Sequence, residues 1–130
     1  MLELKGLSKK DKYQILKDLD FEQLEQELKE QLTIEAIKKY SIKNKILIIL
    51  QKGFVSDIKG FRQLETIGLR PLPNSGIFIY APNLYKNNET QEQELKGFRL
   101  ITVFDIKETR PLTEQEISKS KYYNKELAIS

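Results

Sequence analysis

The chain of 130 residues contains no histidine, no cysteine and no tryptophan. Without histidine and cysteine the most common acid–base and nucleophilic side chains are missing, and a His-Glu-x-x-His zinc site is excluded. A glycine-rich phosphate loop of the form Gly-x-x-x-x-Gly-Lys does not occur either. Glu92 and Glu94 fall in a polar stretch, and Asp105 with Glu108 lacks a third convergent acid for magnesium. We therefore expect a binding protein that is not an enzyme, with no metal and no cofactor.

Long apolar runs are missing as well. The longest, residues 46–50, is far shorter than the ~20 residues that a helix needs to span a bilayer. The start of the chain leads into charged sequence and not into the apolar core of a signal peptide. Since the absence of cysteine gives no sign of an oxidising compartment, we expect a cytoplasmic protein with no membrane partner.

The net charge of +3 is concentrated in the middle of the chain. Residues 38–70 hold eight lysines and arginines against two acidic residues, a local balance of +6. Residues 1–37 are acidic, with six basic residues against nine acidic ones. A local positive excess favours a polyanionic partner. A solvated, lysine-rich surface without such a partner is the alternative.

Caps and apolar spacing predict helices in the first third of the chain. Ser8 is a natural N-cap, with Asp11 in the first turn, where a carboxylate suits the helix dipole. After a break near Asp20 we expect a second, longer helix, because apolar residues recur at helical spacing: Phe21, Leu24, Leu28, Leu32 and Ala36. We expect this acidic third to be scaffold.

Residues 40–53 contain the most informative helix. Ser41 is a natural N-cap and Gly53 a natural stop, which predicts a helix over residues 42–52. Because apolar side chains surround almost its whole circumference, this helix should be buried at the centre of the fold. We expect a connector, a short helix and then a turn or loop to follow, over residues 55–59, 61–67 and 71–76.

From residue 77 the pattern changes to that of strands. Residues 77–81 are β-branched and aromatic, and Pro82 is expected to end this strand; residues 83–97 should form a loop and residues 98–106 a second strand. A capping box at Thr113 predicts a C-terminal helix over about residues 113–126. This order predicts an α+β fold, with N-terminal helices and the buried central helix packed on a small, mainly antiparallel sheet. The length fits a single domain of residues 1–130.

Several short motifs follow one another at characteristic spacing. They are Tyr-Ser-x-x-Asn-x-x-Leu-Ile-x-x-Gln at residues 40–51, Gly-Phe at 60–61, Gly68, Ile-x-Ile-x-x-Pro at 77–82, and Gly-Phe at 97–98 leading to Val-Phe-Asp at 103–105. Together they resemble the N-terminal domain of ArdC-type antirestriction proteins over about residues 20–112. The resemblance implies a small α+β domain that binds single-stranded DNA in plasmid and phage proteins, here without the zinc metallopeptidase-like domain that often accompanies it. The chain departs from the family at Leu64, where a tryptophan is usual, and at residues 69–76, where the basic turn is missing.

Binding of a single strand requires cations along the phosphates and aromatic faces on which bases stack. The residues that we expect to contact the strand are Lys43, Asn44, Lys45, Lys52, Lys59, Arg62, Arg70, Tyr80 and Tyr85. Asn44 has an alternative role in capping or in fixing a loop, because an amide in an apolar helix must find a partner. Asp105 follows an apolar strand, and we expect its carboxylate to form a structural ion pair with one of the basic residues.

We thus expect sequence-tolerant binding of single-stranded DNA by a mobile-element or phage protein, in an antirestriction or anti-defence role. The alternative is a protein–protein interaction module that inhibits or recruits a host defence protein and has lost DNA binding, which the missing basic turn favours. A third alternative is a fragment of a longer protein. Basic residues of 43–70 gathered on one face would favour DNA binding through them, and scattered ones would exclude it.

Overall fold

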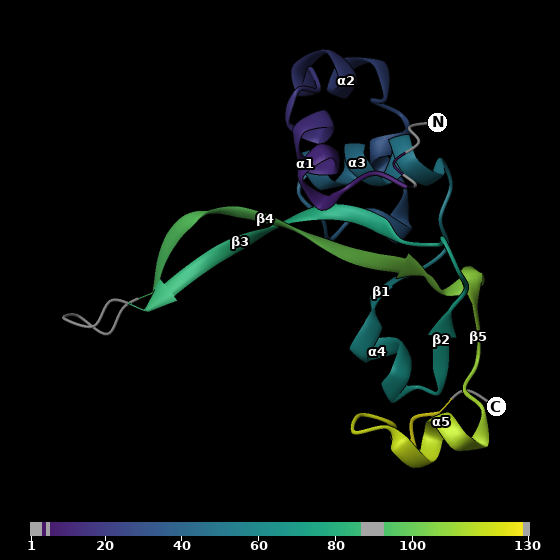
Figure 1. The fold of residues 1–130 in the computed structure, drawn as a ribbon. Helices are drawn as coiled ribbons and strands as arrows, with labels where there is room; N and C mark the ends of the chain where they lie inside the picture. Colours follow the sequence, from purple (N-terminus) through teal and green to yellow (C-terminus); the bar gives the residue numbers. More distant parts are fainter. Residues whose placement is uncertain (1–3, 5, 87–92, 129–130) are drawn as a thin grey trace.

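The computed structural model describes residues 4, 6–86 and 93–128, with the backbone alone over residues 82–86 and 93–98. The fold is α+β, as predicted (Figure 1). A three-stranded antiparallel sheet has the order β1-β4-β3, with bounds Ile58–Gly60, Gln93–Asp105 and Ile77–Lys86. A two-stranded sheet pairs β2 with β5, with bounds Leu69–Pro71 and Thr109–Pro111. Helices α1, α2 and α3 lie on one side of the β3–β4 hairpin, and α4, α5 and the smaller sheet lie on the other.

The first two helices begin at the predicted positions, after Ser8 and after the break near Asp20. Ser8 accepts a hydrogen bond from the N–H of Asp11 and starts α1 (Lys9–Lys17), and Asp20 caps α2 (Phe21–Glu27). The prediction of one longer second helix is wrong, because two short 3₁₀ helices follow, Gln31–Thr33 and Glu35–Ile37. β-Branched Thr33 and Ile34 disfavour a continuous helix, and Ile34 is extended at ψ 128°. The predicted apolar residues still pack on the core.

α3 (Ile42–Lys52) is the central helix of the fold, as predicted. It begins at Ser41 and ends at Gly53, whose φ of 72° favours glycine. Four consecutive residues of α3, residues 46–49, are buried, and they contact both apolar clusters of the core. Fully burying one such side chain contributes about 1.5–3 kcal/mol. Ile42, in the first turn, is the exception, because it is 42% exposed.

The strands differ from the prediction at β1, at the paired ends of β3 and β4, and at β2 and β5, neither of which was predicted. β1 is a strand where a connector was expected: it pairs with residues 103–105 of β4 and buries Ile58 in the core. Pro82 does not end β3, which continues past an irregularity between Pro82 and Leu84 as far as Lys86. Proline is tolerated there because β3 is an edge strand. Much of the predicted loop is therefore paired strand, since residues 84–86 pair with residues 93–95.

The C-terminal part is less helical than predicted. α4 (Phe61–Thr66) matches its prediction, and α5 (Glu114–Lys119) begins at the predicted capping box of Thr113. α5 nevertheless ends well before residue 126, because Ser120 is extended and its hydroxyl accepts backbone hydrogen bonds from the two following tyrosines. Within the described ranges of the chain, no helix is both long enough and apolar enough to cross a bilayer.

Candidate nucleic-acid interface

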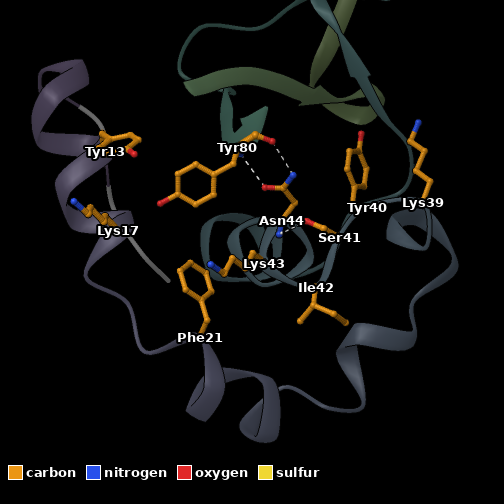
Figure 2. Close-up of a pocket in the computed structure, with 10 residues that line it drawn as sticks. All are labelled: Tyr13, Lys17, Phe21, Lys39, Tyr40, Ser41, Ile42, Lys43, Asn44 and Tyr80. Atoms are coloured by element: carbon orange, nitrogen blue, oxygen red, sulfur yellow. Dashed lines mark hydrogen bonds between the residues drawn. The ribbon is translucent and has the colours of Figure 1, made fainter. Parts of the chain in front are cut away.

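A pocket of about 730 Å³ opens between α1, the N-terminal end of α3 and β3 (Figure 2). Its lining combines lysines, aromatic rings and a few small or polar side chains: Tyr13, Lys17, Phe21, Lys39, Tyr40, Ser41, Ile42, Lys43, Asn44 and Tyr80. None of these lining residues is acidic. Pockets of 300–1,000 Å³ are the usual size for small ligands, so this one has room for a nucleotide unit.

The three lysines give the pocket a positive potential. Lys17 comes from the last turn of α1, Lys39 from the segment before α3, and Lys43 from the first turn of α3. Lys43 lies over the Phe21 ring with its Nζ 5.4 Å from the ring centroid, and the residue is exposed. Among the residues that the structure describes, no carboxylate lies within ion-pair distance of these three lysines.

The four aromatic rings of the pocket are all partly exposed. Tyr13 and Tyr80 meet edge to face, with centroids 6.0 Å apart and an interplanar angle of 82°. The pKa of Tyr80 is raised mainly by burial and to a smaller extent by the charge of the neighbouring Tyr13 hydroxyl group. The pKa of Tyr40 is likewise raised mainly by burial and to a smaller extent by the negative charge of Asp57. At neutral pH both hydroxyls therefore stay protonated, as donors that suit an anionic ligand.

Two amide side chains of α3 hold the backbone of β3 beside the pocket. The Asn44 amide nitrogen donates to the carbonyl of Tyr80 (2.9 Å), and the N–H of Tyr80 donates to the Asn44 amide oxygen (2.8 Å), as the dashed lines in Figure 2 show. Gln51 makes the same two bonds with Phe78, at 2.8 and 2.9 Å. The backbone of Tyr80 is thus fixed to α3. The sequence left open a structural role for Asn44 in capping or in fixing a loop, and the structure shows that its amide fixes a strand instead.

Three of the nine predicted contact residues lie together in this pocket: Lys43, Asn44 and Tyr80. The others are spread over α3, β1, α4 and β2, which lie on different sides of the β3–β4 hairpin (Figure 1). Tyr85 belongs to β3, but its side chain is outside the described part of the chain.

Most of the remaining predicted cations have other partners. Lys52 pairs with Glu108 at 2.9 Å and Lys59 with Asp57 at 3.4 Å. Arg70 pairs with Glu116 at 2.6 Å and with Glu65 at 3.6 Å, while Arg62 lies 4.9 Å from the ring of Tyr122. Lys45 is partly buried on α3. The basic residues of 43–70 are therefore scattered and form no single basic path, which is the outcome expected to exclude DNA binding through them as a set. Contact by individual residues outside the pocket stays a prediction.

The pocket instead uses residues that sequence patterns did not select. Tyr13, Lys17 and Phe21 come from the acidic third that was expected to be scaffold, and Lys39 directly precedes Tyr40. One local signal exists, because Tyr13 and Lys17 are four residues apart and share a helix face. The tertiary fold alone brings these two residues together with residues 39–44 and β3.

Asp105 is a structural residue. It is only 2% exposed, and it accepts hydrogen bonds from the Ser56 hydroxyl (2.8 Å) and from the N–H groups of Ser56 and Lys107. Burial raises its pKa, but these hydrogen bonds outweigh burial, and the pKa ends below its ordinary value. Lys107 Nζ is 3.9 Å away, at the limit of an ion pair. In the part of the chain that the structure describes, no group of three or more acidic side chains converges to hold a metal.

Fold and pocket together describe a small α+β protein with a basic, aromatic recess. No protein-family model matches the chain, and a search of curated proteins found no match. Among solved structures, the chain is similar to the metal-free crystal structure of the antirestriction protein ArdC from the R388 plasmid. That match has 20% identity and a TM-score of 0.36 and covers 57% of this chain. It spans 30% of the ArdC chain, so function is argued below from this chain's own contacts.

Proposed function

We propose that the protein binds single-stranded DNA without strong sequence preference, through the pocket between α1, α3 and β3, and that it acts by binding without catalysis. The observation that carries the proposal is the composition of this pocket: three lysines and four aromatic rings, with no acid among the lining residues. Non-specific single-strand binding uses the same combination of cations along phosphates and rings beneath bases.

The geometry favours a single strand over a duplex. A recess lined by partly exposed rings receives bases that are splayed out, whereas the bases of a duplex are stacked inside it. Lys17, Lys39 and Lys43 would bind phosphates around the recess, and Tyr13 and Tyr80 would contact bases. The sequence resemblance is the support for the further proposal that this activity serves an antirestriction or anti-defence role in a plasmid or phage.

A pair of neighbouring lysines gives a sharp test. Lys39 lines the pocket, whereas Lys38 pairs with Glu35 and does not line it. Lys39→Gln should weaken binding of a labelled single strand of about 20 nucleotides by roughly tenfold or more, because a charge-assisted contact is worth ~1.5–3 kcal/mol. It should also reduce the slope of log affinity against log salt by about 0.7. Fluorescence anisotropy at several salt concentrations, with duplex DNA as comparator, measures both.

Lys38→Gln makes the same charge change one residue away and is the matched control, with affinity expected to stay within about twofold. Absence of binding by the unmodified protein at low salt would refute the proposal and leave the protein–protein alternative. Equal losses in the two variants would show that net charge matters and the pocket does not.

A further inference from the structure

A second pocket adjoins the first. It has a volume of about 470 Å³ and is again lined by cations and an aromatic ring: Lys9, Lys10, Tyr13, Gln14, Arg99 and Leu100. No acid is among these lining residues. We infer that a bound strand continues past Tyr13 into this second pocket, so that the interface consists of two adjoining subsites. This inference rests on the proposed function.

Tyr13 lines both pockets and so marks their boundary. Lys9 and Lys10 belong to the first turn of α1 and Lys17 to its last turn, with Tyr13 between them. Lys10, Tyr13 and Lys17 follow i, i+3, i+7 spacing and share one helix face. At 1.5 Å per residue, the cations at the two ends of this face are about 10 Å apart along the axis. A chain of phosphates passing Tyr13 would meet a lysine on either side.

The β3–β4 hairpin connects the same two pockets from the opposite wall. Tyr80 of β3 lines the first pocket, and its cross-strand partner Leu100 lines the second. Arg99, which pairs with Ala81, adds a third cation to the second pocket. Both walls, α1 and the hairpin, are thus shared by the two pockets, as a continuous path requires.

The acidic residues of α1, Asp11 in the first turn and Asp18 at the C-cap, line neither pocket. Asp18 is nevertheless near the second pocket, because it accepts two hydrogen bonds, at 3.0 and 3.1 Å, from the side-chain nitrogen of Gln14, which lines that pocket. α1 therefore presents cations to both pockets although the first third of the chain is acidic overall.

The position of Lys9 and Lys10 disfavours a purely structural role. The N-terminal end of a helix carries partial positive charge, so lysines in its first turn oppose the helix dipole. Replacing them should leave the thermal midpoint unchanged or raise it slightly, and any loss of binding then cannot be a loss of folding.

The experiment measures anisotropy with labelled oligothymidylates of about 4 and about 12 nucleotides, two lengths within the ~4–16 nucleotides that single-strand binding domains cover. The double variant Lys9→Gln/Lys10→Gln should bind the longer strand about tenfold to a hundredfold more weakly, with a salt slope reduced by about 1.4. It should bind the shorter strand within about twofold of the unmodified protein. Lys43→Gln, in the first pocket, should weaken both lengths, and the matched control Lys119→Gln/Lys121→Gln should weaken neither.

The outcomes separate the two proposals. If Lys43→Gln weakens binding while the Lys9/Lys10 double variant matches the control on the longer strand, the second subsite is refuted and the proposed function stands. If the double variant weakens binding of both strands equally, the two lysines act through the overall positive potential of the protein, and the second subsite is again refuted. If the unmodified protein binds neither strand, the proposed function fails and the second subsite with it.

Discussion

At the scale of single residues, Asn44 and Gln51 provide hydrogen-bond partners for the outer edge of β3. An edge strand leaves N–H and C=O groups without a neighbouring strand. A carboxamide carries one acceptor and one donor group, like a peptide unit, and each of these two side chains pairs with both groups of one β3 residue. The same bonds hold Tyr80 beside the lysines of α3.

Asn44→Ala should lower the free energy of unfolding by about 1–3 kcal/mol, because the backbone groups of Tyr80 lose their partners in a partly buried place. Chemical denaturation measures this value. Gln23→Ala is the control, because its side chain bonds to Glu27 on an exposed surface, and a change within about 0.5 kcal/mol is expected. Equal losses would contradict a special role for Asn44.

At the scale of elements, one carboxylate joins α5 to both strands of the smaller sheet. Glu116 of α5 accepts hydrogen bonds from Arg110 of β5, at 2.8 and 3.0 Å, and from Arg70 of β2, at 2.6 Å. Hydrogen bonds from the Arg110 side chain and then from the N–H of Thr113 lower the pKa of Glu116 to about 2 from an ordinary value of 4.5. The ion pairs of Glu116 with Arg70 and Arg110 thus help to hold α5 against the smaller sheet.

The lowered pKa of Glu116 predicts a pH dependence of stability. A carboxyl whose pKa is lower in the folded state stabilises the fold fully above pH 4.5, and this contribution disappears as the pH falls toward about 2. Glu116→Gln should therefore have a lower thermal midpoint than the unmodified protein at pH 7, and the difference should shrink toward zero near pH 2. Thermal denaturation followed by circular dichroism tests this.

Glu114→Gln, an exposed acid in the first turn of the same helix, is the control, and a much smaller difference at pH 7 is expected. A Glu116→Gln difference that persists unchanged to pH 2 would show that the carboxylate charge is not responsible.

At the scale of the whole molecule, α3 connects the two apolar clusters. Ile46, Ile48 and Ile49 belong to the larger cluster with β1, β3 and β4, and Leu47 belongs to the smaller one with Leu16 of α1. α1 and the β3–β4 hairpin, which form the walls of both pockets, therefore both pack on one helix.

Ile48→Ala should lower the free energy of unfolding by about 2–5 kcal/mol, because it leaves a cavity at a fully buried position. Ile15→Ala on α1, where the side chain is 36% exposed, should cost about 1 kcal/mol or less. Denaturation followed by far-UV circular dichroism and by tyrosine fluorescence should give one coincident transition. Separate transitions would contradict a single domain.

Much of the fold was predictable from local patterns. Ser8, Ser41 and Thr113 cap helices as predicted, because a cap depends on residues within one turn. Predictions that needed distant partners were wrong: β1 is a strand only because β4 lies beside it, and β3 passes Pro82 only because its outer edge needs no strand partner. Polar residues beyond Pro82 gave no apolar pattern by which to recognise the hairpin.

By itself the sequence determined the α+β class, the helix starts and the central apolar helix, since caps and apolar periodicity act over a few residues. Only the tertiary structure decided which cations meet which rings. It pairs Lys52, Lys59 and Arg70 with carboxylates, and it brings Lys17 of the acidic third beside Lys43. The physical reason is that electrostatic potential depends on distances in space, and residues far apart in sequence become neighbours only when the core packs.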